Sequence, residues 1–158
     1  MRELILLRHA HAEPAQAGQP DLDRPLSPDG HAEAEAAARW LAGKRLVPDC
    51  VLCSPARRTR ETLENVLSVL GYVDQRLESQ IYEATAGTLA GLVDAHREVD
   101  RLLLVGHNPG LERLVALLHS GQSSEFRGMP PGAVAVLEFG TEGPVEPGVA
   151  SLSAFWWP

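Results

Sequence analysis

Short aliphatic runs that alternate with segments of helical periodicity constrain the fold of this chain more than any other feature. Buried strands are expected at 3–8, 49–54, 76–82, 100–107, 133–139 and 149–157. Helices are expected at 27–44, 54–71, 87–97 and 108–119. This alternation predicts an α/β protein, a three-layer α/β/α sandwich with a mostly parallel central sheet. A length of 158 residues fits a single domain over 1–158.

Two of the expected helices carry clear local signals. Ser27 is a favourable N-cap, Pro28 suits the first helical position, and Gly43 lies near the expected end. In the segment at 54–71, apolar residues recur at i, i+3, i+4 and i+7 and define one buried face. These residues are Leu63, Val66, Leu67 and Leu70. A polar loop through residue 26 connects the first strand to its helix.

The charge and hydropathy of the chain exclude some classes of partner. A net charge of −7 argues against nucleic-acid binding, which uses basic surfaces. It does not exclude an anionic substrate, because a local positive cluster can lie within an acidic surface. No stretch approaches the ~20 apolar residues of a membrane span, and the N-terminus does not resemble a signal peptide. We therefore expect a cytoplasmic protein with no membrane partner, whose oligomeric state the sequence leaves open.

The two cysteines form a C-x-x-C pair at Cys50 and Cys53. This spacing suggests redox chemistry or a metal site. However, the pair lies in an expected strand, where residues three apart point to opposite faces. A second pair that would complete a zinc site is missing from the sequence. We therefore interpret both cysteines as small buried residues.

Three of the expected strands end on residues suited to binding an anion. The first ends at Arg8 and His9, the second leads into Arg57 and Arg58, and the "DRLLLVGH" strand ends at His107. In open α/β sheets, ligands bind outside the carboxyl ends of the strands. Helix N-termini at that edge offer unpaired N–H groups, and arginines offer forked donors. The sequence therefore predicts a phosphoryl-binding pocket at this edge of the sheet.

Two strand–helix junctions share a further signal. Ser54-Pro55 and Asn108-Pro109 each read as a cap residue followed by a proline, which predicts a helix directly after the strand. Taken one by one, the arginines at the strand ends could be solvated surface charges, and His107 could be a packed histidine. Their joint placement at three strand ends favours a functional site.

Four motifs together resemble a known family. They are "LLRHA" (6–10), "DRPLSPDG" (23–30), "SPARRTRETLE" (54–64) and "LLLVGHNPG" (102–110). In this order and spacing they resemble the histidine phosphatase superfamily, and within it the small SixA-type phosphohistidine phosphatases. The resemblance implies a phosphoglycerate mutase-like fold and phosphatase activity.

The resemblance also implies roles for individual residues. His9 corresponds to the nucleophile that forms a phosphohistidine intermediate, and Arg8 to the residue that grips the phosphoryl oxygens. The family's Ser-Pro-x-x-Arg pattern places its second arginine at Arg58, which leaves Arg57 as a surface charge. His107 corresponds to the second pocket histidine, which stabilises charge on the transferred group. A neutral His9 is required for attack, and neighbouring arginines favour that form.

Other motif residues have less certain expectations. Asn108 is a candidate substrate contact, whereas Arg24 and Ser27 are expected to tie the long loop to its helix. The motifs offer no carboxylate cluster for Mg²⁺. We therefore expect no metal and no cofactor.

Two alternative substrates differ in their leaving group and in whether that group needs a catalytic acid to protonate it. Glu83, in "IYEATAGTL", is a candidate catalytic acid, and its alternative role is that of an exposed loop carboxylate; His11 and Glu13 are weaker candidates. The absence of a long insertion between 54 and 110 favours an open site and a phosphohistidine on a partner protein. The alternative is a phosphomonoesterase for a small phosphate ester, with Glu83 as its acid. A non-enzymatic phosphate-binding module is the third possibility.

Overall fold

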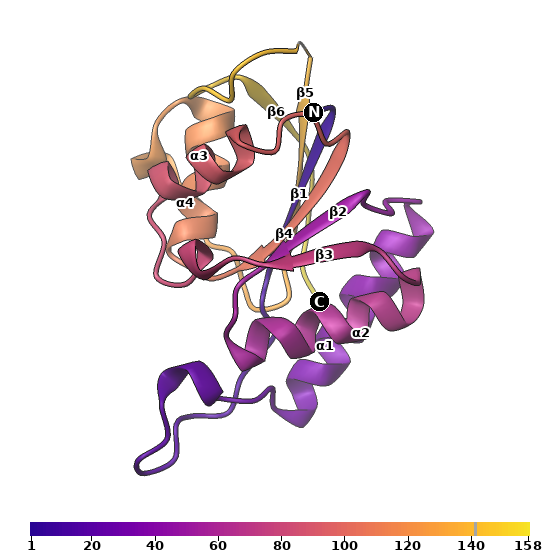
Figure 1. Ribbon diagram of the computed structural model, residues 1–158, viewed down its shortest axis with the longest axis vertical. Helices are drawn as coiled ribbons and strands as arrows, with labels where there is room; N and C mark the ends of the chain where they lie inside the picture. Colours follow the sequence, from indigo (N-terminus) through magenta and orange to yellow (C-terminus); the bar gives the residue numbers. More distant parts are fainter. Residues whose placement is uncertain (141) are drawn as a thin grey trace.

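A six-stranded mixed sheet forms the centre of the computed structural model, which describes residues 1–140 and 142–158 (Figure 1). The strands are β1 (Glu3–Arg8), β2 (Cys50–Cys53), β3 (Asp74–Leu77), β4 (Arg101–Gly106), β5 (Val134–Phe139) and β6 (Ala150–Trp156). Their order is β3-β2-β4-β1-β5-β6. The first four are mutually parallel, whereas β5 and β6 are antiparallel to their neighbours. The predicted mostly parallel sheet is confirmed.

Helices cover both faces of this sheet. They are α1 (Pro28–Gly43), α2 (Arg57–Leu70), α3 (Ala86–Asp94) and α4 (Gly110–Ser120). The short 3₁₀ turns are η1 (Asp21–Asp23), η2 (Ser79–Ile81) and η3 (Ser123–Glu125). Helices α1 and α2 lie together on one face, and α3 and α4 on the other (Figure 1). The predicted three-layer sandwich is therefore confirmed.

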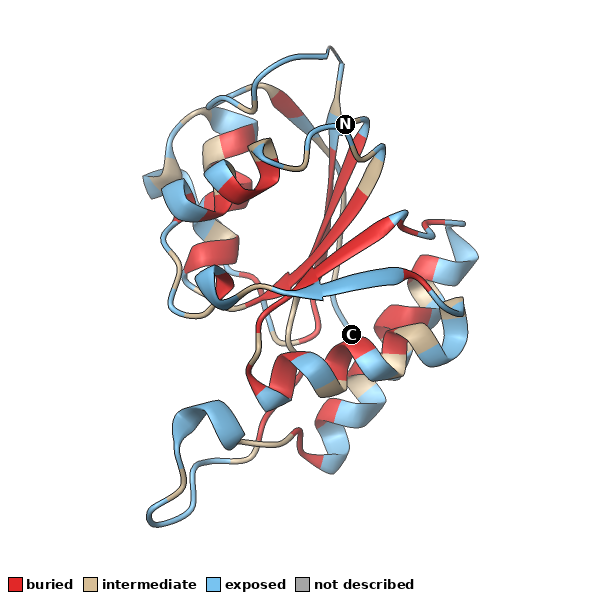
Figure 2. Ribbon diagram, in the orientation of Figure 1, coloured by how far each residue is buried: buried red, intermediate tan, exposed pale blue. Residues whose placement is uncertain are grey.

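The central strands are apolar on both sides because each face is covered. Along β1, Leu4 and Leu6 pack with the α3–α4 layer, while Ile5 and Leu7 pack with the α1–α2 layer. Figure 2 shows β1 and β4 buried along most of their length and β3 exposed at the sheet edge. A fully buried leucine contributes ~1.5–3 kcal/mol. The continuous aliphatic runs thus fix the strands whose ends form the site.

The structure confirms that both cysteines are buried residues of strand β2. Cys50 belongs to the hydrophobic cluster on one face of the sheet, and Cys53 to the cluster on the other. Burial raises the pKa of the Cys53 thiol to about 12. Its thiolate is therefore strongly disfavoured, which does not suit redox chemistry.

Some predicted boundaries are wrong. The third strand is Asp74–Leu77 instead of 76–82, because Ile81 packs into the core from the turn η2. The cap–proline signals predicted that the helices begin at Pro55 and Pro109, whereas α2 begins two residues later, at Arg57, and α4 one residue later, at Gly110. By contrast, Ser27 caps α1 as predicted, and its hydroxyl accepts a 3.0 Å hydrogen bond from the N–H of Gly30.

Residues 13–26 run along one end of the molecule and carry η1 (Figure 1). The bridge between Ala12 and Leu26 closes this segment at its base. In the part of the chain that the structure describes, no helix has the length and apolar character needed to cross a membrane.

Candidate active site

The carboxyl ends of β1 and β4 bring two histidines together. The strands are parallel and pair Arg8 with Gly106, so the next residue in each is a histidine. The ring centroids of His9 and His107 lie 5.2 Å apart. Arg58 reaches the same place from the first turn of α2. The strand ends therefore converge as the sequence predicted.

One pocket of about 740 Å³ contains every predicted site residue. These are Arg8, His9, Arg58, Glu83, His107 and Asn108. Asp21, Arg24, Tyr82 and the start of α3 also line it. Arg57 is not part of the lining, and its Nε lies 3.2 Å from a Glu61 carboxylate oxygen on the outer face of α2. The structure thus separates the two adjacent arginines as expected.

Two of the pocket arginines, Arg8 and Arg58, are anchored through their Nη atoms and leave Nε unpaired among the described residues. Nη1 of Arg8 donates to the carbonyl oxygen of Met129 at 2.9 Å, and Nη1 of Arg58 donates to that of Asp21 at 2.8 Å. The Nε atoms of both arginines are buried and have no hydrogen-bond partner among residues 1–140 and 142–158. A buried donor of this kind is costly unless an acceptor binds it. Oxygens of a phosphoryl group fit this requirement.

His9 is held in the form that a nucleophile needs. Its Nδ1 lies 2.7 Å from the carbonyl oxygen of Ala10, so Nδ1 carries the proton and donates. In the neutral ring, Nε2 then bears the lone pair. Burial, together with the smaller effects of the Arg58 and Arg8 charges, lowers the pKa of His9 to about 4. The sequence-based reasoning identified the arginines correctly but missed burial as the larger cause.

His107 is oriented by a residue that the sequence did not single out as a ligand. Its Nε2 lies 2.7 Å from Oγ of Ser54, which follows β2. Ser54 Oγ also accepts from the N–H of Ala56 at 3.3 Å, and the described residues offer its own proton no other acceptor, so we assign that proton as the donor to Nε2. Nδ1 of His107 then carries the ring proton. Burial lowers the pKa of His107 to about 3, so the ring is neutral at physiological pH.

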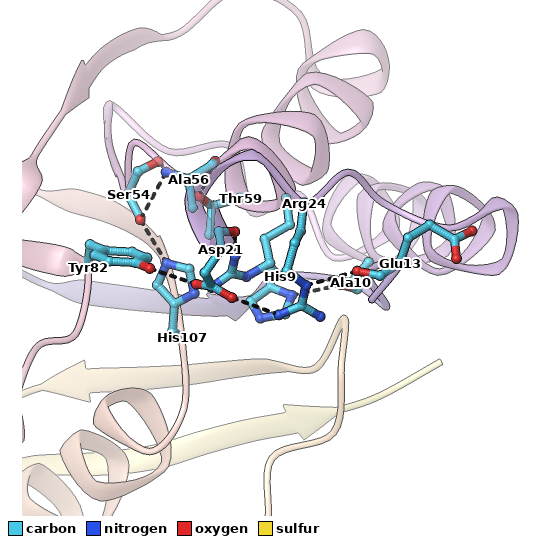
Figure 3. Close-up of polar contacts among 11 residues, drawn as sticks. His9, Ala10, Glu13, Asp21, Arg24, Ser54, Ala56, Thr59, Tyr82 and His107 are labelled. Atoms are coloured by element: carbon cyan, nitrogen blue, oxygen red, sulfur yellow. Dashed lines mark hydrogen bonds and ion pairs between the residues drawn. The ribbon is translucent and has the colours of Figure 1, made fainter. Parts of the chain in front are cut away.

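A carboxylate at the mouth of the pocket joins three segments (Figure 3). Asp21 lies 3.0 Å from Nη2 of Arg58 and 3.0 Å from Nη1 of Arg24, and it accepts a 2.6 Å hydrogen bond from the Tyr82 hydroxyl. Tyr82 also packs edge-on against His107, with ring centroids 5.6 Å apart. Sequence reasoning missed Asp21 and Tyr82, because both lie in irregular segments without periodic spacing.

Arg24 has both a structural and a pocket position. Its Nε donates to the carbonyl oxygen of Glu13 at 2.9 Å, which ties the loop together as expected. It also lines the pocket and adds to the positive charge near His9. The expectation that Arg24 is structural alone was therefore too narrow. The motif "DRPLSPDG" was the available signal for it.

The remaining candidates differ in how freely they face the pocket. Asn108 donates to the carbonyl oxygen of Met129 at 2.8 Å and accepts from the N–H of Glu112, so its amide anchors the start of α4. Glu83 is exposed, has a positive φ of 57°, and forms no hydrogen bond with other described residues. His11 bonds to the Ser27 hydroxyl and does not line the pocket.

The site suits the binding of an oxyanion. Arg8, Arg24 and Arg58 supply positive charge, while two neutral imidazoles supply a lone pair and a donor. Within the described residues, no three His, Cys, Asp or Glu side chains are placed to hold a metal ion. Metal independence stays a prediction that activity measurements test.

Comparison with known proteins gives consistent matches. The family model of the histidine phosphatase superfamily (branch 1) matches residues 4–99. An uncharacterised chloroplast protein of Arabidopsis thaliana is 33% identical over 80% of this chain and 62% of its own length. Phosphohistidine phosphatase SixA of Escherichia coli is 31% identical over 77% of this chain and 76% of its own. The crystal structure of a SixA protein from Agrobacterium tumefaciens superposes with a TM-score of 0.86, 32% identity and coverage of 99% and 98% of the two chains.

Proposed function

Since this chain belongs to the SixA type of the histidine phosphatase superfamily, we propose that it removes phosphoryl groups from phosphohistidine on proteins, with His9 as nucleophile. The observation that carries the proposal is the pairing of a neutral His9 with the half-buried Arg8 and the buried Arg58. Both arginines line the same pocket as this ring, and the Nε of each is buried without a hydrogen-bond partner among the residues that the structure describes. A phosphoryl group bound there satisfies both donors and meets the nucleophile.

The reaction proceeds in two transfers. Nε2 of His9 attacks phosphorus, the bond to the substrate nitrogen breaks, and its electron pair stays on the departing imidazole. Water then attacks the phosphohistidine at position 9, the P–Nε2 bond breaks, and inorganic phosphate forms. Because His9 is neutral in the free enzyme, no proton has to be removed before the attack.

The surrounding cations stabilise the transferring group. Charge on the phosphoryl oxygens is met by Arg8, Arg58 and the Nδ1 proton of His107. A hydrogen bond to a charged group contributes ~1.5–3 kcal/mol. Several such bonds lower the barrier without a metal ion, provided that they are in place before the reaction. The main-chain carbonyls that anchor Arg8 and Arg58 provide this preorganisation.

The open side of the pocket supports a protein substrate. Between Ser54 and Gly110 the chain forms only α2, β3, η2, α3 and β4. A long insertion that covers the pocket is therefore lacking in this region. A histidine displayed on the surface of another protein can approach from this side. SixA of Escherichia coli, a relative of this chain, is a phosphohistidine phosphatase.

A second candidate function is the hydrolysis of a small phosphate ester. The exposed carboxyl group of Glu83 lines the pocket and could protonate an alkoxide leaving group. Under this alternative, Glu83→Gln slows ester cleavage much more than phosphohistidine cleavage. Equal losses on both substrates would remove Glu83 as the acid.

The two functions are separated by substrate profiling. We would measure kcat/KM with a phosphorylated histidine phosphotransfer domain and with a panel of phosphate esters, with and without EDTA. The proposal predicts the highest kcat/KM for the phosphohistidine protein and no effect of EDTA. A much higher value for an ester would favour the alternative. Loss of activity with EDTA and recovery with Mg²⁺ would contradict metal independence.

A further inference from the structure

Asp21 binds the two Nη atoms of the Arg58 guanidinium group and leaves its Nε without a contact. Its main-chain oxygen accepts from Nη1 of Arg58, and its carboxylate Oδ2 accepts from Nη2. These two contacts use the hydrogens at the Nη1–Nη2 end. The other edge of the group, which carries Nε and the second hydrogen of Nη2, stays available for a phosphoryl oxygen.

The carboxylate of Asp21 is ionised and partly open to solvent. Donation from Tyr82, Arg24 and Arg58 holds the pKa of this carboxyl group far below its usual range. Asp21 therefore cannot act as a proton donor at physiological pH. Its side chain is 49% exposed, compared with 7% for Arg58, which places Asp21 at the mouth and Arg58 deep in the pocket.

The leaving group must depart toward the mouth. In-line transfer places the nucleophile and the leaving group on opposite sides of phosphorus. His9, at the end of β1, is half-buried, whereas Asp21 and Glu83 in the same pocket are exposed, so the bond that breaks points outward, toward these two residues. Two carboxyl groups line the outer part of the pocket, Asp21 and Glu83. Of these, Asp21 is fixed by three side-chain contacts.

We propose that Asp21 is a specificity-determining residue: its carboxylate accepts a hydrogen bond from the distal N–H of the substrate's phosphohistidine ring. This inference rests on the proposed function and names a residue that selects P–N over P–O substrates. An ester oxygen has no such N–H and needs a proton that Asp21 does not carry. An imidazole leaving group brings its own N–H to the carboxylate.

The proton balance of the step follows directly. A phosphohistidine protonated at its distal nitrogen is a cation at the ring. When the P–N bond breaks, the electron pair stays on the proximal nitrogen, and the ring leaves as neutral imidazole that keeps its distal N–H. The Asp21 carboxylate stabilises the protonated ring before cleavage and remains ionised throughout. It thereby keeps the better leaving group populated at higher pH.

The test compares Asp21→Asn with Asp23→Asn as a matched control on the same 3₁₀ turn. Asp23 does not line the pocket. We would measure kcat/KM for a phosphohistidine peptide and for p-nitrophenyl phosphate from pH 6 to 9. The nitrophenolate leaving group needs neither a proton nor an N–H partner, so its rate reports folding and the placement of Arg58 in the same sample.

We expect Asp21→Asn to lower the ratio of phosphohistidine to p-nitrophenyl phosphate kcat/KM roughly tenfold, since a charge-assisted hydrogen bond is replaced by a neutral one. The basic limb of the phosphohistidine profile should move to lower pH. Asp23→Asn should keep the wild-type ratio. Asp21→Glu, which keeps the charge, should retain a higher ratio than Asp21→Asn even where both rates fall.

Two results would overturn the inference in distinguishable ways. Equal losses on both substrates in Asp21→Asn, with the pH limb unmoved, would mean that Asp21 only positions Arg58. Wild-type protein without activity on phosphohistidine would overturn the proposed function itself, and the inference with it.

Discussion

The ring centroids of His9 and His107 lie 5.2 Å apart, with the ring planes inclined at 57°, because β1 and β4 are paired in a register that ends both strands together. One ring presents a lone pair at Nε2, fixed by the Ala10 carbonyl, and the other presents a donor, fixed by Ser54. Burial lowers the pKa of both rings and thereby keeps both neutral. The sheet register thus sets the geometry of the candidate site.

The adjacent arginines of α2 provide a matched pair of variants. Arg58→Gln removes the charge and the Nε edge that face the phosphoryl group, and we expect kcat/KM to fall by roughly 10²–10⁴-fold, the equivalent of two lost charge-assisted hydrogen bonds. Arg57→Gln removes only an exposed ion pair with Glu61 and should stay within about twofold of wild type. Steady-state kinetics on both proteins check this. Similar losses in the two variants would contradict the assignment.

Ser54 should affect the rate of catalysis by orienting the ring of His107. Ser54→Ala leaves Nε2 of His107 without its partner, and we expect kcat/KM to fall roughly tenfold, since an unpaired buried polar group costs ~1–3 kcal/mol. Ser153→Ala is the control, because it removes a hydroxyl of the same kind outside the pocket. The Ser153 hydroxyl donates to the main-chain carbonyl of Val136. Kinetics together with the NMR tautomer signature of His107 test this. Wild-type kinetics and an unchanged tautomer in Ser54→Ala would show that the bond has no catalytic role.

The two pocket histidines should titrate well below ordinary histidines. We expect NMR inflections near pH 4 for His9 and pH 3 for His107, compared with ~6.5 for an unperturbed ring. Both folded-state pKa values are lowered, so the unfolded chain takes up these protons first as the pH falls. The free energy of unfolding should therefore decline as the pH falls from about 6.5, with the share of His9 ending near pH 4 and that of His107 near pH 3, and these two groups should cause no pH dependence above this window.

The variant His9→Asn separates this effect from other titrations. It should show a shallower decline of the unfolding free energy over the same pH window, because one of the two groups is gone. Inflections of His9 and His107 near pH 6.5 in the native protein would contradict the buried, neutral pair.

Gly110 fixes the pocket wall that carries Glu83. A Cβ at Gly110 would lie 2.6 Å from the carbonyl oxygen of Ala84 and 3.1 Å from a methyl group of Leu89. Gly110→Ala should therefore lower the free energy of unfolding by roughly 1–3 kcal/mol and reduce activity by displacing this loop. Gly43→Ala is the control, because a Cβ there meets nothing within 4 Å.

Chemical denaturation and steady-state kinetics on the two glycine variants decide the matter. Gly43→Ala should leave stability unchanged or raise it by up to ~1 kcal/mol, and it should not alter activity. If Gly110→Ala matched it in both respects, the close approach of Ala84 to α4 would have no energetic importance.

The sequence predicted those parts of the site that follow buried strands. A continuous aliphatic run fixes a central strand, and the residue after it must lie at the sheet edge, which is why Arg8, His9 and His107 could be placed. A local helix signal placed Arg57 and Arg58 together near this edge, and the resemblance to the family's Ser-Pro-x-x-Arg pattern selected Arg58. Strand β3 was misplaced because its sequence Asp74–Leu77 is exposed and lacks an apolar run.

The mouth of the pocket could not be predicted in this way. Asp21 and Tyr82 lie in irregular segments that meet only through tertiary contacts, including their mutual 2.6 Å hydrogen bond. No local pattern records that these segments approach the ends of β1 and β4. The burial that lowers the pKa of His9 is likewise a property of the packed molecule.

Trapping the covalent intermediate tests the central claim most directly. The protein would be mixed with a phosphohistidine substrate, quenched at alkaline pH within milliseconds, and analysed by mass spectrometry with fragment ions that distinguish His9 from His11 and His31. We predict one acid-labile phosphoryl group on His9, absent from His9→Ala, whose circular dichroism should match the wild type. A phosphoryl group on another residue, or turnover retained in His9→Ala, would contradict the account.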